Sequence, residues 1–312
     1  MTHIKFGIQT AQQHVPYQEM LKLWQHVDRL GYDSAWVFDH FIPIRGDVEG
    51  PCLECWTLLS ALAVQTARLR VGTLVAGNTY RHPAVLANMA ATVDVVTGGR
   101  LEFGIGAGWY QKEHEAYGVP FYTTGQRIRM LDEAIQVIKL LWTEHAPTFP
   151  GKYYQLKEAL AEPKPVQKPR PPIWVGGQGE QLTLRVVARQ ADGWNTFLMP
   201  WTEYRRKLDA LERHCLTERR DPATVERSLA GALVIGDPKV LAGRADAIAR
   251  NRGFPPDQLR ERMFYGSPQE VAEQINTWAE RGVSHFLFST GAPYDYDAFS
   301  LFAQEVIPLF RK

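Results

Sequence analysis

An acid and an imidazole stand side by side at positions 39 and 40, directly after the apolar run AWVF at 35–38. An imidazole titrates near neutral pH, so His40 is suited to general acid or base chemistry if the fold brings it to a reactive site. The alternative is structural, with Asp39 and His40 forming a hydrogen-bonded pair that closes a strand. The position at which the run 35–38 ends in the fold decides between the two.

A glycine-rich segment, FGIGAGWYQKEH at 103–114, approaches the G-x-G-x-x-G pattern of dinucleotide-binding folds. The match fails because Trp109 occupies the sixth position. It also fails because the segment follows the fourth predicted strand, whereas that fingerprint belongs after the first. We therefore predict no nicotinamide dinucleotide site here. Glycines that only allow close packing of strands are the other explanation of this segment.

A second glycine cluster, in WVGGQGEQLTLRVVA at 174–188, directly precedes a predicted helix. Gly176, Gly177 and Gly179 leave backbone N–H groups accessible at the helix N-terminus, which favours an anion. We predict that phosphate binds there, against the alternative of a simple turn between a strand and a helix.

Several other chemistries lack the residues they need. A metal-dependent barrel hydrolase would carry paired histidines at the end of the first strand, where this chain has Gln9 and Thr10. Cys52 and Cys55 have zinc or redox spacing, but no second pair exists, so we predict ordinary thiols and no metal site. The run KEHE at 112–115 is predicted to be the solvated face of a helix. No predicted strand ends on a lysine that would form a Schiff base.

An alternation of short apolar runs with helical patterns must position these groups. Helices are predicted at 17–31, 54–66, 83–96, 125–142, 180–190 and 202–217, and one more begins after the N-cap Ser267. Strands are predicted at 4–10, 34–38, 69–75, 100–106, 173–177, 192–196, 229–235 and 284–290. Eight strands separated by helices fit an α/β fold, a single (β/α)8 TIM barrel with insertions over residues 1–312. Barrel enzymes place their chemistry at the C-terminal ends of strands, where Asp39 and His40 fall.

Length and charge narrow the class of protein. The 312 residues carry 35 Lys and Arg against 34 Asp and Glu, a formal net charge of +1, and the two signs are interspersed. Nucleic acid and anionic membranes are therefore poor partners. No apolar run approaches the roughly 20 residues that span a bilayer, and the N-terminal stretch lacks the regions of a signal peptide. We predict a soluble, cytoplasmic protein.

The segment RLRVGTLVAGNTYRHPAVLANMAATVDVVTGGRLEFGIGAGWYQKEHEAYGVPF at 68–121 resembles the luciferase-like flavin and deazaflavin oxidoreductases. The stretches FGIQT, AWVFDHF, PPIWVGGQGEQLTLRVVARQADGWNT and GSPQEVAEQINTWAERGVSHFLFST also resemble that family, so the similarity spans nearly the whole chain. TYRHPAVLA, D-x-x-x-G-G-R and GIGAGW are similar to the branch that uses coenzyme F420, the deazaflavin analogue of FMN. The resemblance implies the bacterial luciferase-like form of the barrel.

The resemblance implies where the cofactor would lie. Its ring would sit at the C-terminal mouth of the barrel against the ends of strands three and four, with its phosphate at the second glycine cluster and the hydroxyl of Thr196. Members carry a non-prolyl cis peptide behind the ring, which falls at Leu74-Val75 here. The predicted cofactor-binding residues are Asp39, Leu74, Val75, Ala76, Gly77, Asn78, Gly106, Ala107, Gly108, Trp109, Gly176, Gly177, Gln178, Gly179 and Thr196.

The resemblance also implies roles around the reacting carbon. A deazaflavin performs hydride chemistry and lacks the flavin position that traps oxygen, so the protein supplies orientation and a proton path. His40 is the predicted catalytic acid or base, and Asp39 a cofactor contact at a bulge, through its side chain or its backbone. Some sugar-phosphate and alcohol oxidising members have an acid where Trp109 stands, so Trp109 predicts an apolar or aromatic wall of the substrate pocket. Gln9 and Trp36 are the predicted neighbours of Trp109 in the substrate pocket.

Three functions remain open from the sequence. The first is an F420-dependent oxidoreductase that acts on a small conjugated or carbonyl substrate. The second is an FMN-dependent monooxygenase of the same fold, which would require a partner reductase and oxygen. The third is a non-catalytic flavin-binding protein, against which the retained His40 argues. We expect a small-molecule substrate and a homodimer.

Overall fold

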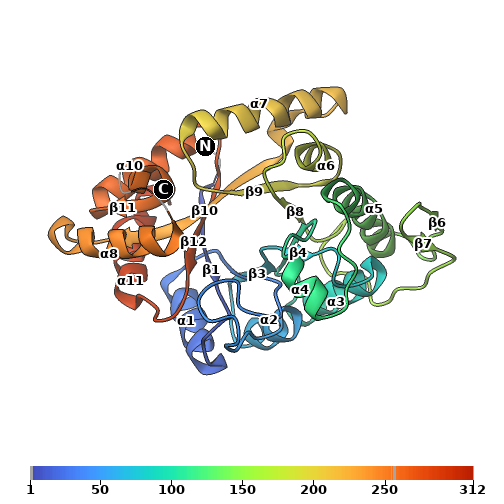
Figure 1. Ribbon diagram of the computed structural model, residues 1–312, viewed down its shortest axis with the longest axis horizontal. Coiled ribbons are helices and arrows are strands. Elements are labelled where there is room, and N and C mark those ends of the chain that lie inside the picture. Colours follow the sequence, from blue (N-terminus) through green and yellow to red (C-terminus); the bar gives the residue numbers. More distant parts are fainter. Residues whose placement is uncertain (1–2, 254, 256–257, 312) are drawn as a thin grey trace.

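The computed structural model describes residues 3–253, 255 and 258–311. Within these residues eight parallel strands close into a barrel, β1 (Lys5–Thr10), β2 (Ser34–Val37), β3 (Arg70–Thr73), β5 (Leu101–Gly106), β8 (Ile173–Gly176), β9 (Gly193–Phe197), β10 (Glu226–Ile235) and β12 (His285–Thr290). The first and last of these strands pair with each other, so β1 and β12 close the ring. In Figure 1 the strands surround the centre and the helices lie outside them. The predicted (β/α)8 barrel is confirmed.

The helices follow the strands around the ring. They are α1 (Tyr17–Leu30), α2 (Cys55–Ala63), α3 (Pro83–Val96), α4 (Gln111–Ala116), α5 (Thr124–Thr143), α6 (Thr183–Gln190), α7 (Trp201–Thr217), α8 (Pro238–Arg252), α9 (Leu259–Arg262), α10 (Pro268–Glu280) and α11 (Tyr296–Glu305). Two of their ends show the expected signals. α1 ends at Gly31 in the left-handed conformation, and α10 begins with the reciprocal bonds of a capping box between Ser267 and Glu270.

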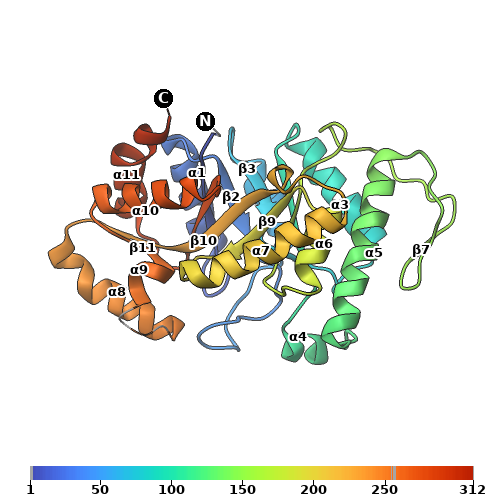
Figure 2. The same cartoon turned by 90° about the horizontal axis from the view of Figure 1, so that it is seen from above.

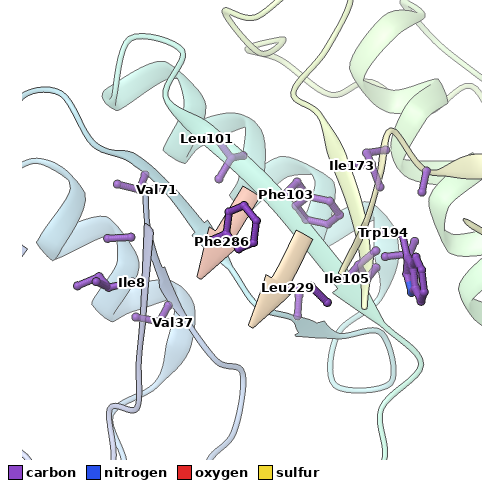
Figure 3. Packing of buried hydrophobic residues seen from close by; sticks show 14 of the residues in the cluster. Ile8, Val37, Val71, Leu101, Phe103, Ile105, Ile173, Trp194, Leu229 and Phe286 are labelled. Carbon is purple, nitrogen blue, oxygen red and sulfur yellow. The ribbon is translucent and has the colours of Figure 1, made fainter. Parts of the chain in front are cut away.

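The main core lies between the strands and the helices. Alternate residues of a strand point to opposite faces of the sheet, so every second strand residue faces outward. Figure 3 shows such outward residues from successive strands, among them Ile8, Val37, Val71, Phe103 and Phe286. All five are fully shielded from solvent, and the residues that alternate with them, such as Trp36 and Leu287, face the barrel interior.

Two indole rings pack in the barrel interior together with Leu74, Ala230 and Leu287. Trp36 on β2 and Trp174 on β8 meet edge to face with centroids 6.2 Å apart. A Cβ added at Gly72 would lie 2.7 Å from the Trp36 ring, and one at Gly193 would lie 2.2 Å from the Trp174 ring. Glycine is therefore required at these two inward positions, and the filled interior forms a floor beneath the C-terminal mouth.

The strand predicted at 69–75 is interrupted. β3 stops at Thr73, the peptide bond Leu74-Val75 is cis, and pairing with β5 resumes in the short strand β4 (Ala76–Gly77). The expected cis bond is confirmed at the expected position. The apolar sequence of this run predicts a continuous strand because a cis bond leaves no signal in periodicity.

Other elements were missed or misplaced. The strand predicted at 229–235 begins at Glu226, and its end pairs with an unpredicted strand, β11 (Met263–Gly266). With α8 these ends enclose a separate small apolar cluster that includes Leu241 and Met263. A two-stranded hairpin of β6 (Phe149–Pro150) and β7 (Gln155–Leu156), also unpredicted, projects from the barrel. Such two-residue strands are too short to show an alternation.

The two ends of the barrel differ in what they carry. Figure 2 shows the two termini at one end and α4 at the opposite end. The loops that follow the C-terminal ends of the strands open at the α4 end, which is therefore the end at which the site is expected. Of the helices that the structure describes, none is long and apolar enough to cross a membrane.

Candidate active site

A cavity of about 470 Å³ opens at the C-terminal mouth of the barrel. Its size is within the range of small-molecule sites. Thirteen of the predicted site residues line it, Gln9, Asp39, His40, Leu74, Val75, Ala76, Gly77, Gly108, Trp109, Gly176, Gly177, Gln178 and Thr196. Six lining residues were not predicted, Phe38, Ile44, Arg45, Tyr80, Asn195 and Phe197.

Five predicted site residues lie outside this lining, Trp36, Asn78, Gly106, Ala107 and Gly179. Trp36 belongs to the interior floor, and its indole N–H donates to Ser34 Oγ at 2.8 Å. It is 1% exposed, so it has no surface with which to contact a substrate, and we withdraw it from the substrate residues. The side chain of Asn78 is buried and donates to the hydroxyl of Tyr154 at 3.2 Å.

The cis bond at Leu74-Val75 is held from the first strand. Gln9 Nε2 donates to the Leu74 carbonyl at 3.5 Å, and Gln9 Oε1 accepts from the Ser289 hydroxyl at 2.8 Å. The Val75 side chain fills the space beside two glycines, since a Cβ at Gly106 or Gly176 would lie within 2.8 Å of it. Gln9, predicted as a substrate contact, thus has its amide engaged in fixing the cavity wall.

The side chain of Asp39 is fully engaged in contacts within the protein. Its carboxylate accepts from both terminal nitrogens of Arg81, at 2.7 and 3.1 Å, and from the Gly77 N–H at 2.9 Å. Burial raises the pKa of Asp39, and the Arg81 guanidinium offsets part of that rise. The carboxylate oxygens therefore connect the end of β2 to β4. Of the two expected modes of cofactor contact, the backbone one is compatible with this arrangement.

His40 is backed by a buried carboxylate. Its Nδ1 lies 2.8 Å from Oε2 of Glu113 on α4, and Glu113 is fully shielded from solvent. The hydroxyl of Tyr80 donates to the same oxygen, while the N–H groups of Phe41 and Ile42 donate to Oε1. The loop after β2 is thereby anchored to α4 through a single side chain.

The charge of Glu113 fixes the tautomer of His40. Burial acts to raise the pKa of Glu113, but hydrogen bonds from His40, Tyr80 and the Phe41 N–H outweigh burial and hold the pKa below its usual value. An ionised carboxylate only accepts hydrogen bonds, so His40 Nδ1 carries a proton. In the neutral ring the lone pair is then on Nε2, which is the nitrogen free for proton exchange.

The prediction of a solvated helix face at 112–115 was wrong for two of its four residues, since Lys112 and Glu115 are exposed. Glu113 and His114 are both fully buried, and His114 Nε2 lies 2.7 Å from the Thr79 hydroxyl. Charged composition alone suggested exposure, but α4 has only six residues and turns two of its polar side chains toward the mouth. The usable signal was position, because Glu113 lies in the short segment that follows the C-terminal end of the barrel strand β5.

Aromatic rings surround His40. Phe38, Trp109 and Tyr110 all meet it edge to face, with centroid distances of 5.2, 5.6 and 5.9 Å. Trp109 also stacks on Tyr110, yet 61% of Trp109 stays exposed. Trp109 therefore forms an aromatic part of the cavity lining beside the imidazole.

The opposite wall is made of backbone and small residues. Gly177 has φ +148°, and a Cβ there would lie 2.8 Å from Cγ2 of Thr183, the first residue of α6. The buried Lys207 donates to the Gln178 carbonyl at 3.4 Å from behind. The Thr196 hydroxyl is buried in the lining with no hydrogen-bond partner among the described residues. Such an unpaired group is costly unless a ligand meets it.

The cysteines do not contribute a ligand set. Cys52, Cys55 and Cys215 are free thiols. Cys52 donates to the His40 carbonyl at 3.5 Å, and burial raises its pKa to about 12, which keeps it a thiol. Within the described part of the chain no three His, Cys, Asp or Glu side chains are grouped to hold a metal ion.

Known proteins resemble this chain over nearly its whole length. An F420-dependent glucose-6-phosphate dehydrogenase of Kineococcus radiotolerans is 29% identical, covering 99% of this chain and 97% of the relative. The oxygenase component of a flavin-dependent trigonelline monooxygenase of Acinetobacter baylyi is 27% identical, covering 95% of this chain and 90% of the relative.

Solved structures share the fold. An F420-dependent secondary alcohol dehydrogenase in complex with an F420-acetone adduct superposes with a TM-score of 0.85 at 21% identity, covering 99% of this chain and 100% of that chain. The family model described as luciferase-like monooxygenase matches residues 1–248. A match over most of the chain shows that the protein belongs to the luciferase-like monooxygenase family.

Proposed function

We propose that the protein is an oxidoreductase that transfers hydride between coenzyme F420 and a small organic substrate. The observation that carries the proposal is the division of the cavity. One wall offers an imidazole backed by a buried carboxylate, and the other offers glycine backbone and an unpartnered hydroxyl. F420-dependent dehydrogenases among the relatives support the choice of cofactor.

The residues present fit a deazaflavin cofactor. The ends of β3 and β5, at 74–78 and 106–109, would hold its ring, with Val75 behind the ring. Gly176, Gly177 and Gln178 lie between β8 and α6, which begins at Thr183. The Gly177 N–H already donates to the Asn195 carbonyl at 3.3 Å, so the phosphate would be met by the other backbone N–H groups of this segment and by the free hydroxyl of Thr196. When bound, the cofactor supplies a carbon that accepts or donates hydride.

The protein supplies the proton path. Glu113 keeps the proton of neutral His40 on Nδ1, so Nε2 takes the proton from a substrate hydroxyl when the substrate is oxidised. In the reverse direction the imidazolium returns that proton to the substrate. The carboxylate of Glu113 stabilises the imidazolium while it exists, as a carboxylate orients and stabilises histidine in other acid–base pairs.

Binding of two cofactors to the cofactor-free protein tests the proposal. F420 is expected to bind at least tenfold more tightly than FMN, a difference of about 1.4 kcal/mol. The spectrum of bound F420 then reports hydride transfer when candidate substrates are added. Equal or tighter binding of FMN would overturn the proposal and favour an FMN-dependent monooxygenase with a partner reductase.

We extend the proposal to the organisation of the protein. One catalytic domain over residues 1–312 is supported by the pairing of β1 with β12, which lie near the two ends of the chain. A homodimer is supported by Val85, Val95 and Val96, which are exposed on α3. A cytoplasmic location is supported by the three free thiols, which a reducing compartment preserves.

A further inference from the structure

We infer that the substrate is a small organic anion, with its carboxylate held by Arg45 and an apolar, ring-bearing body held between Trp109 and Phe197. The inference rests on the proposed function, since it names the substrate class of the same site.

The lining carries one unbalanced charge. Asp39, the one carboxylate among the lining residues, is paired through two bonds with Arg81, which also pairs with Glu54. Arg45 is the one lysine or arginine among the lining residues, and within the described part of the chain it forms no ion pair. An apolar cavity with a single unpaired guanidinium is suited to a ligand that carries a carboxylate.

Arg45 is presented at a fixed place although its side chain is exposed. Its carbonyl accepts from Gln13 Nε2 at 2.7 Å and lies 3.0 Å from His14 Nε2. The N–H of Ile44 donates to Gln13 Oε1 at 3.0 Å. The loop after β2 is therefore anchored to the loop after β1 on both sides of the peptide bond that joins Ile44 and Arg45.

The guanidinium does not belong to the expected phosphate site. The order of strands around the ring is β1, β2, β3, β5, β8, β9, β10 and β12. Arg45 follows β2, whereas Gly177 follows β8 and Thr196 is on β9, three and four places away in a ring of eight. A phosphate bound at the far side of the mouth leaves Arg45 for a second anionic group.

Two exposed aromatic side chains define the body of the ligand. Trp109 is 61% exposed and Phe197 is 58% exposed, and both line the cavity. They come from the ends of β5 and β9, and Ile44 adds an aliphatic side chain beside Arg45. Large apolar side chains that stay exposed in a concave site indicate an apolar ligand surface.

Paired probes test the two parts of the inference. The dissociation constants of 2-naphthoate and its neutral isostere 2-naphthamide are measured by calorimetry on the F420-loaded and the cofactor-free protein. The parent is expected to bind the naphthoate at least tenfold more tightly than the amide. Arg45→Gln should remove that difference and leave F420 affinity within about twofold. Trp109→Ala should weaken both probes by a similar factor, roughly tenfold.

Arg213→Gln is the matched control. Arg213 is an exposed arginine late in α7, away from the cavity lining, so this variant loses the same charge and should keep the preference for the naphthoate. Equal binding of the two probes to the parent, no binding of the naphthoate, or a preference that survives Arg45→Gln would overturn the inference. So would a loss of F420 affinity in Arg45→Gln. Failure of F420 to bind the parent would instead reject the proposed function, and the cofactor-free measurements would still decide the role of Arg45.

Discussion

The two walls of the cavity are built in different ways. On the wall formed by the loop after β2 and by α4, the polar side chains are already bonded to one another, as Glu113 shows with its four donors. On the wall formed by β8 and β9, the groups are glycine backbone and a hydroxyl that lacks a partner. The first wall is organised before a ligand arrives, and the second is completed by one. Substitutions on the first wall should therefore lower the rate of hydride transfer, and substitutions on the second wall should lower the affinity for the cofactor.

On the wall formed by the loop after β2 and by α4, His40→Ala is expected to have the largest effect. It should lower the hydride-transfer step by about a hundredfold to ten-thousandfold, the usual scale for a general acid or base. F420 affinity should stay within a few fold, because backbone groups and the opposite wall hold the cofactor. Single-turnover reaction, followed by the absorbance of F420, measures the step. A variant that reacts at the parent rate across the pH range would leave His40 with a structural role only, as the partner of Glu113.

On the wall formed by β8 and β9, Gly177→Ala should weaken cofactor binding. Its Cβ would lie 2.8 Å from Thr183 and would require φ +148° from alanine, so the loop before α6 must shift. We expect F420 to bind about tenfold more weakly while bound cofactor reacts at the parent rate. Gly243→Ala, where an added Cβ meets nothing within 4 Å, is the control and should bind normally. Normal binding by a folded Gly177→Ala protein would place the anion elsewhere.

Thr196→Val sharpens the comparison because it removes a group that has no partner. The cofactor-free protein should keep or slightly raise its melting temperature, since burying an unpaired hydroxyl is unfavourable. F420 affinity should fall about fivefold, roughly 1 kcal/mol. Thermal melting with and without F420 measures both effects. A melting temperature that falls in the cofactor-free protein would show that Thr196 is already bonded within the protein.

The smallest expected effect is on the pH dependence of the free energy of unfolding. The pKa of Glu113 is lower in the folded state than its ordinary value of 4.5, so its stabilising contribution is fully present above that value. The contribution is lost as the pH falls through the lowered folded-state pKa. Urea unfolding between pH 6 and pH 3 should therefore show a steeper loss of unfolding free energy in the parent than in Glu113→Gln. Asp39 is present in both proteins and cancels in the difference. Parallel curves would contradict an ionised Glu113.

The sequence predicted what depends on local pattern. The outward residues of β1, β2 and β5 form apolar runs, and the glycines at 176–179 precede a helix, so the barrel and one wall of the cavity could be anticipated. The other wall depends on contacts across long separations. Glu113 meets His40 over 73 residues, and Arg81 meets Asp39 over 42. Neither contact follows from spacing, and the polar face of a six-residue helix resembles a solvated surface until its neighbours are known.

The pairing of β1 with β12 sets the order in which the site can be assembled. Ring closure brings Gln9 to Ser289, and the same glutamine supports the carbonyl of Leu74 at the mouth. A chain still being synthesised has most of both walls before β12 leaves the ribosome, but it lacks the partner that fixes Gln9. Contacts of such long sequence separation form late in folding. We therefore expect capture of the cofactor to follow complete synthesis of the barrel.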